Sequence, residues 1–145
     1  MRFFLLACII LIGVTGCGDN GGRVSVSGSV TFDGKPLEDG SITFGGDKGA
    51  AGVGKIVNGQ FSLSESANES GVLPGNYKVL ISSWFEERGS VLPNGSFSPG
   101  KTRIPLIYLD AEKSGLVADV QSKGKNHFTF ELTSDADKVK KSAAK

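Results

Sequence analysis

The sequence predicts an all-β protein, a seven-stranded β-sandwich that follows an N-terminal signal peptide. Apolar and polar residues alternate with period two over short stretches between residues 24 and 133, which is the pattern of half-buried strands. Glycine reaches 21 of 145 residues without a collagen period, and turn-forming pairs separate the alternating stretches. No long stretch has the apolar spacing of an amphipathic helix.

Composition narrows the class of protein. The chain carries 16 basic and 15 acidic residues, a formal net charge of +1, so it has no basic excess that would attract nucleic acid. Hydrophobic residues make up 39% and charged residues 21%, as in globular rather than disordered chains. Two cysteines are too few for a disulfide scaffold.

Residues 1–16 have the layout of a secretory signal peptide. A basic residue, Arg2, precedes an apolar run from Phe3 to Ile12, and small residues then lead to Cys17. The run is shorter than the ~20 residues that span a bilayer. A buried strand or a signal anchor is the alternative interpretation of this segment.

The end of this segment, Val14–Cys17, resembles the bacterial lipobox. The resemblance implies cleavage between Gly16 and Cys17, diacylglycerol on the thiol of Cys17, and often a further acyl chain such as palmitate on its amine. Two or more acyl chains anchor a protein stably, at about 0.8 kcal/mol per buried methylene. Cys8 would leave with the signal peptide, so the mature domain would have no free thiol.

Residues 17–23 are expected to form a lipidated, flexible tether, since Asp, Asn and glycines offer nothing to bury. Gly18, rather than an aspartate, follows the cysteine. By the sorting rule of enteric bacteria this favours the outer membrane over the inner membrane. Loss of Arg2 leaves 15 basic and 15 acidic residues, a net charge of zero. The sequence therefore predicts a lipid-anchored, extracytoplasmic protein of the cell envelope.

The domain itself spans residues 24–133. In its first strand, valines and Phe32 alternate with serines and threonines. Residues Asp33–Pro36 are typical of a turn, and Pro36, which has no backbone N–H to donate, is expected to end the hydrogen-bonded strand pairing. Asn58-Gly59 is the strongest hairpin signal, because both positions of such a turn need positive φ. Pro74-Gly75 makes a further turn. We expect the seven strands at residues 24–32, 41–44, 53–57, 60–64, 77–85, 116–120 and 126–132.

Two regions break the alternation. Residues 86–109 contain prolines and several glycines, so we expect a long excursion at one end of the sandwich, and loops of that length are often functional. Residues 134–145 alternate charged with small residues and lack an apolar face, so we expect a flexible charged tail.

Glycines and prolines follow one another in a set order along the domain. Gly28–Leu37 is followed by Asp39–Phe44, then by Asn58–Phe61, Gly71–Val79 and Asn126–Leu132. This order resembles that of carboxypeptidase regulatory-like (transthyretin-like) domains, including those of short planctomycete-type lipoproteins. The resemblance covers nearly all of residues 24–133 and implies a seven-stranded, transthyretin-like (Ig-like, prealbumin-like) sandwich. It also implies an accessory or binding module rather than an enzyme, because the matching positions are structural.

One motif points to a function that its context does not support. Gly95–Thr102 satisfies the phosphate-loop pattern G-x-x-x-x-G-K-[ST], which needs a helix that begins at the lysine. Pro105 would break the first turns of that helix, and no convincing strand precedes Gly95. We expect neither a nucleotide nor any other cofactor.

Residues for metal or catalytic chemistry are scarce. His127 is the only histidine and falls on the polar face of a strand. Without cysteines it cannot build a typical zinc site, and no G-x-S-x-G nucleophile elbow accompanies it. Acidic residues crowd the early turns, where calcium is the alternative to solvated carboxylates: Asp33, Glu38, Asp39 and Asp47. We expect no metal site and no catalytic residue.

Trp84 and Phe85 begin the excursion, beside Glu86, Glu87 and Arg88. Aromatic rings beside charges at the end of a sandwich can bind a glycan or a protein partner. We favour the alternative in which both rings close the core, because aromatic rings dominate core burial.

The sequence favours a non-catalytic binding or structural module of the cell envelope. Its partners would be the membrane, through the lipid anchor, and envelope proteins or glycans. The first alternative is a small extracytoplasmic hydrolase or metal-dependent enzyme, which would need His127, an acid and a serine in one pocket. The second alternative is a small-ligand carrier.

Overall fold

The computed structural model describes residues 22–46, 49–66 and 69–135. The predicted signal peptide, the cleavage site at Gly16 and Cys17, most of the predicted tether, Asp47 and residues 136–145 of the predicted tail lie outside these residues. Within them the protein is all-β, as predicted, with one short 3-10 helix, η1 (Leu106–Leu109). No helix in this part of the chain has the length and apolar character needed to cross a bilayer.

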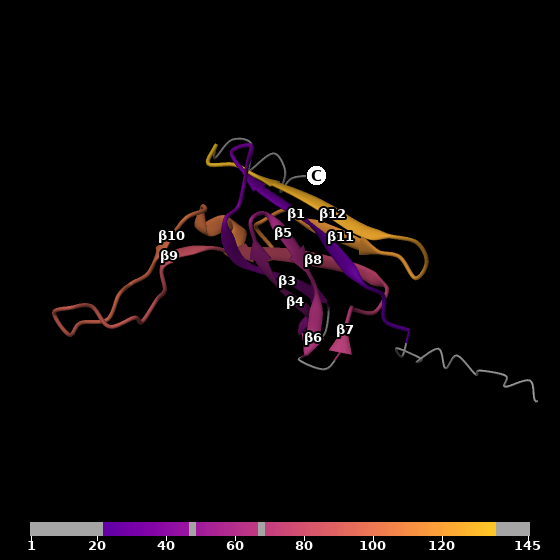
Figure 1. The fold of residues 1–145 in the computed structure, drawn as a ribbon, viewed down its shortest axis with the longest axis horizontal. Coiled ribbons are helices and arrows are strands. Elements are labelled where there is room, and N and C mark those ends of the chain that lie inside the picture. Colours follow the sequence, from indigo (N-terminus) through magenta and orange to yellow (C-terminus); the bar gives the residue numbers. More distant parts are fainter. Residues whose placement is uncertain (1–21, 47–48, 67–68, 136–145) are drawn as a thin grey trace, which may run out of the picture.

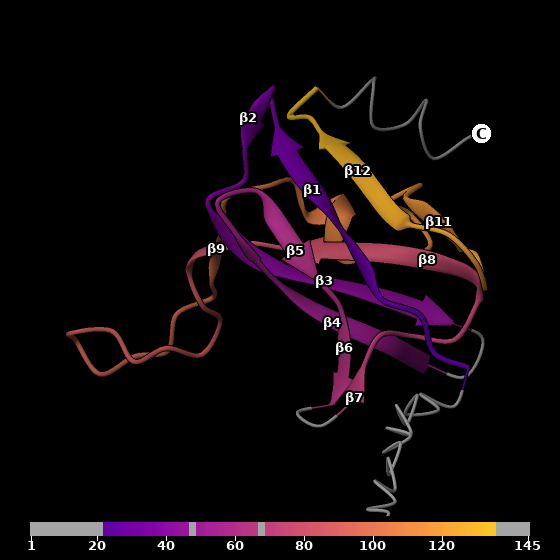
Figure 2. The ribbon, with the colours of Figure 1, turned by 45° about the vertical axis from the view of Figure 1, so that its right-hand side comes forward.

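Seven strands form one continuous path through a curled sheet (Figures 1 and 2). Their order across the sheet is β11-β8-β3-β4-β5-β1-β12, and every neighbouring pair is antiparallel except β1 and β12, which run parallel. The strands are β1 (Val26–Phe32), β3 (Asp39–Gly46), β4 (Gly49–Val57), β5 (Gln60–Ser62), β8 (Gly75–Ser82), β11 (Val117–Val120) and β12 (Asn126–Leu132).

Each predicted strand overlaps one strand of this path, so the period-two alternation located them correctly. The number of strands was underestimated, because the described residues contain five more short ones. Two- and three-residue strands are too short to show a clear alternation. The three-residue β5 was located because it follows the Asn58-Gly59 turn. The additional strands are β2 (Lys35–Pro36), β6 (Ser64–Ser66), β7 (Glu69–Ser70), β9 (Trp84–Glu86) and β10 (Lys101–Thr102).

The core lies inside the curl, and Phe44 on β3 is at its centre. The Phe44 ring is fully buried, and its centroid lies 6.3 Å from that of Phe61 on β5 and 5.9 Å from that of Tyr77 on β8. It lies 6.2 Å from Phe130 on β12, in an edge-to-face arrangement. Edge-to-face and tilted ring pairs add to the free energy gained by burial alone. The aromatic cluster therefore joins β12, at one end of the strand path, to β3, β5 and β8.

The predicted hairpin turn is confirmed. Asn58 and Gly59 have φ of 49° and 77°, and they join β4 to β5. Asp33 and Gly34 repeat this geometry, with φ of 48° and 78°, and bring Pro36 opposite Thr31 on β1. Two successive positive φ values match the right-handed twist of the flanking strands, which is why short polar residues and glycine occupy both turns.

The second half of the predicted excursion belongs to the body of the protein, so its prediction as an excursion through residue 109 was wrong. Ile104 and Tyr108 are buried in the core, and the Tyr108 hydroxyl accepts a hydrogen bond of 3.0 Å from the backbone nitrogen of Thr133. Burial raises the pKa of Tyr108, against a smaller lowering by its bond to Thr133. Pro105 is the N-cap residue directly before η1 and has φ of −54°, a value that its ring favours.

We predict that Gly28→Ala lowers the free energy of unfolding by about 1–3 kcal/mol, the usual cost of overpacking. A Cβ at Gly28 would collide with the backbone oxygen of Phe128 and would lie 2.7 Å from the Phe61 ring. Gly45→Ala is the matched control, because a Cβ there meets only the Lys78 oxygen, at 3.5 Å. Denaturant unfolding of both variants measures the difference, and equal stabilities would contradict this account of the β1–β12 contact.

Candidate functional site

Residues 84–103 leave the sheet as a projecting hairpin, which we call the arm (Figure 1). Strands β9 and β10 pair at its base, with Glu86 opposite Lys101. Further out, the nitrogen of Gly89 donates to Ser98 O and the nitrogen of Ser98 donates to Ser90 O, both at 2.8 Å. The first half of the predicted excursion is therefore a hydrogen-bonded hairpin rather than an open loop.

The tip of the arm is apolar and exposed. Val91 and Phe97 face each other across an antiparallel bridge and are 70% and 73% exposed. The Leu92 nitrogen donates to Ser96 O at 2.8 Å, and the Asn94 side chain accepts from the Ser96 nitrogen at 3.0 Å. These bonds fix the turn that presents the apolar pair, so a binding partner would meet it already ordered.

Arg103 ties the arm to the sheet. Its guanidinium Nε lies 3.4 Å from Asp39 Oδ1 and donates to Trp84 O at 3.4 Å, while an Nη atom lies 3.6 Å from a Glu38 oxygen. The guanidinium carbon is 4.0 Å from the centroid of the Phe85 ring, which is cation–π geometry. One side chain therefore joins the start of β3 to the base of the arm.

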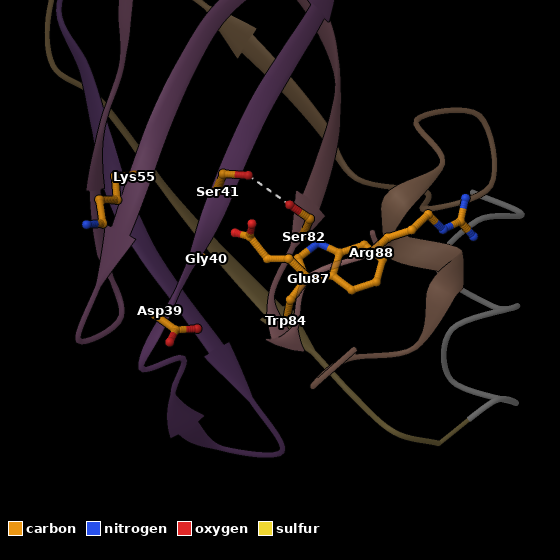
Figure 3. Close-up of a pocket in the computed structure, with 8 residues that line it drawn as sticks. All are labelled: Asp39, Gly40, Ser41, Lys55, Ser82, Trp84, Glu87 and Arg88. Carbon is orange, nitrogen blue, oxygen red and sulfur yellow. Dashed lines mark hydrogen bonds between the residues drawn. The ribbon is translucent and has the colours of Figure 1, made fainter. Parts of the chain in front are cut away.

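A cleft opens between the arm base and the sheet (Figure 3). It has a volume of about 600 Å³, and the Ser41 and Ser82 hydroxyls in its wall lie 2.8 Å apart. The lining residues come from β3, β4, β8 and the arm: Asp39, Gly40, Ser41, Lys55, Ser82, Trp84, Glu87 and Arg88. Two carboxylates, two cations, two hydroxyls and an indole suit the binding of a polar, uncharged ligand such as a sugar.

The preferred interpretation of Trp84 and Phe85 as core residues was wrong for Phe85. Phe85 is 60% exposed beneath the Arg103 guanidinium, whereas Trp84 is half-buried and lines the cleft. A Cβ at Gly100 would lie 2.7 Å from the Trp84 ring, so that ring packs on the arm's own backbone. Because the arm leaves the sheet here, alternate residues of β9 no longer have a core on one side.

Sequence reasoning missed Arg103 and assigned Asp39 only to a turn. Arg103 lies 64 residues after Asp39 in the chain, and no local pattern indicates that the two side chains meet. The one signal available was the alternation of Lys101 and Arg103 around Thr102, which is typical of an exposed strand.

The phosphate-loop pattern lies within the arm. Lys101 and Thr102, which would begin a helix in a nucleotide-binding loop, form strand β10 instead. The described members of the early acidic set do not form one cluster. Glu38 and Asp39 face Arg103, whereas the Asp33 carboxylate accepts a 2.9 Å bond from the Ser134 nitrogen. Across the part of the chain that the structure describes, no group of three His, Cys, Asp or Glu residues is placed to hold a metal.

His127 lies on the exposed face of β12, as predicted, near the end where the described chain begins. Its Nδ1 lies 3.4 Å from the Ser27 hydroxyl, and both line a second cleft. None of the described residues that line this cleft is a carboxylate. The arrangement that the hydrolase alternative requires therefore lacks its acid among these residues.

Comparison with known proteins adds no family. No protein-family model and no curated protein matches the chain. Among solved structures, the chain is similar to a 9R-lipoxygenase from Cyanothece PCC8801, at 12% sequence identity and a TM-score of 0.38. The match covers 79% of this chain and 17% of the lipoxygenase chain. A similarity of this size indicates neither a shared fold nor a shared activity.

We predict that Arg103→Ala loosens the arm without unfolding the body. Loss of the contact with Phe85 removes about 0.5–2 kcal/mol of local stabilisation. The amides of Gly89 and Ser98 should then exchange with solvent about two- to thirtyfold faster, while core amides are unchanged. Hydrogen exchange measures this. Lys113→Ala, which removes the exposed pair with Asp110 outside the arm, is the control. Equal exchange in both variants would mean that Arg103 does not hold the arm.

Proposed function

We propose that this protein is a lipid-anchored, non-catalytic binding module of the cell envelope, held at its N-terminal end and engaging an extracytoplasmic partner through the arm. We infer further that the curled sheet is the transthyretin-like sandwich of carboxypeptidase regulatory-like domains, as the positions of the seven path strands and the Asn58-Gly59 turn support. The observation that carries the function is the ordered, apolar arm tip, which lies at the opposite end of the molecule from the start of the described chain.

The two ends are far apart in the fold. The described chain begins on the right in Figure 1, and the arm extends to the left. Close to that beginning, Val24 bridges to Val72. Cys17 precedes Gly22 by five residues, and a fully extended chain of that length reaches about 18 Å at most. Lipid on Cys17 would therefore keep the Val24 end beside the bilayer. The arm would then point away from the bilayer, into the extracytoplasmic space.

The tip has the character of a protein-binding hot spot. Phe97 and Val91 present apolar area on a hairpin that is already ordered, so association would lose little conformational entropy. At the arm base, Glu86 Oε1 is buried without a hydrogen-bond donor among the described residues. Such an acceptor is costly to leave unpaired, and a bound partner can supply the donor. An envelope protein at the tip is the partner that these features favour, with the Trp84 cleft available to a glycan.

Cys17→Ser should abolish membrane attachment and leave the fold unchanged. The substituted hydroxyl cannot carry the thioether-linked diacylglycerol that the lipobox resemblance implies, and the described core contains no part of the tether. Membrane fractionation and intact mass of the extracted protein provide the measurement. A variant that stays in the membrane fraction, or a wild-type chain whose mass shows no acyl groups, would contradict the proposed anchor.

Partner capture tests the arm. A photo-cross-linking residue at position 97 of the membrane-anchored chain should give a discrete protein adduct, and the same residue at exposed position 131 on β12 should give none. Adding Val91→Ser should lower the adduct yield at least about fivefold, because apolar contact at the tip is lost. The melting temperature should not change, since Val91 is exposed. Identical adducts at both positions, or none at position 97, would remove the arm from the function.

A further inference from the structure

A second cleft lies at the end of the molecule where the described chain begins. Its volume is about 590 Å³, close to that of the cleft at the arm. The lining residues come from the first residues of the domain and from the turn that leads into β12: Val24, Ser25, Ser27, Gly124, Lys125, Asn126 and His127. Figures 1 and 2 both place this turn and the start of β1 at the same end, away from the arm.

Parallel pairing creates the cleft. Val26 pairs with Asn126 and Ser27 with His127, so β1 and β12 begin at the same edge of the sheet. Val26 and Asn126 are buried, and the residues that alternate with them point outward. Ser25 and Ser27 from one strand therefore stand beside Lys125 and His127 from the other, although 100 positions separate the two sets.

The side chains on this face are hydrogen-bond donors or cations. No carboxylate is found among the described lining residues, and Lys125 has no ion-pair partner in the described part of the chain. Two other lysines are neutralised by carboxylates: Lys78 pairs with Glu112, and Lys113 with Asp110. An unpaired ammonium among hydroxyls is a site for an anion.

His127 and Gly124 complete the donor set. When the Ser27 hydroxyl donates to His127 Nδ1, at 3.4 Å, the ring proton resides on Nε2 and becomes a further donor. Gly124 has φ of 93°, and a Cβ built on it would meet no atom within 4 Å. The backbone is therefore open to a ligand at the point where the turn meets Lys125.

We propose that this cleft binds a phosphate-type anion through Lys125, His127 and the Ser25 and Ser27 hydroxyls. The phosphate of a membrane lipid headgroup and a free phosphate ion share this chemistry. The lipid source rests on the proposed anchor at Cys17, which would hold this end at the bilayer surface. The anion site itself does not depend on the anchor. The negative surface potential of an anionic bilayer attracts a nearby lysine, and this attraction would strengthen binding of a lipid headgroup by Lys125.

Phosphate titration of the full chain in neutral detergent micelles tests the site. The backbone amides of Gly124, Lys125 and His127 should show saturable NMR shifts with inorganic phosphate and none with chloride at equal ionic strength. The Lys125→Gln, His127→Gln double variant should raise the apparent Kd at least tenfold. Lys35→Gln, an exposed strand lysine on β2, should leave it within twofold. Shifts that do not saturate, or that persist unchanged in the double variant, overturn the proposal.

A second variant and a second medium complete the test. Ser27→Ala should raise the apparent Kd severalfold even if the double variant is unstable, and an unchanged Kd overturns the role of the hydroxyls. In bicelles, shifts of the same amides on adding phosphatidylglycerol to phosphatidylcholine identify a lipid source, whereas shifts with inorganic phosphate alone identify the free ion. No shift in either medium overturns the site. The Cys17→Ser chain should bind phosphate normally, which separates failure of this site from failure of the anchor.

Discussion

The packing of Phe44 against rings from three other strands is the contact on which the rest of the structure depends. Phe61, Tyr77 and Phe130 come from β5, β8 and β12, and each lies about 6 Å from Phe44 between ring centroids. Backbone hydrogen bonds alone are satisfied equally well in an open, twisted sheet, so the curl is favoured by burial of this cluster and of the aliphatic side chains around it. Curling buries the apolar face of every strand on the path against another part of the same path.

The curl also determines where the two ends of the molecule lie. Because β1 and β12 run parallel at one end of the path, their first residues share an edge, and the start of the domain meets the turn before β12 there. The arm leaves from the end of β8, and Arg103 fastens its base to Asp39. This strand pairing thus places the cleft around Lys125 and His127 at one end of the molecule and the apolar arm tip at the other.

Local patterns in the sequence predicted the parts of the fold that local physics determines. Asn58-Gly59 identified its turn because few residues accept two positive φ values, and alternation located the strands because one face of each is buried. The parallel pairing of β1 with β12 was beyond such reasoning, since its hydrogen bonds join residues 100 positions apart. Ile104 and Tyr108 were missed as core residues because they flank Pro105 and lie in no regular strand.

The candidate sites, too, were predictable only where local sequence determines them. Trp84 and Phe85 stood out as aromatic rings beside charges, but whether they faced the core depended on where the chain leaves the sheet. Phe85 is exposed because Arg103, from the returning strand of the arm, covers it instead of the core. The cleft around Lys125 and His127 gave no signal in the sequence, since its hydroxyls come from the other end of the chain.

The central claim is that the proposed anchor and the arm tip lie at opposite ends, so that the tip is held away from the bilayer. If Cys8 is removed and Cys17 acylated as proposed, a cysteine introduced at Asn94 or at Lys123 would be the single free thiol for a fluorescent label. Quenching by headgroup-labelled lipids in the membrane-anchored protein measures the claim directly. The account predicts strong quenching at position 123 and little at position 94. Equal quenching at the two positions, or stronger quenching at position 94, would contradict it.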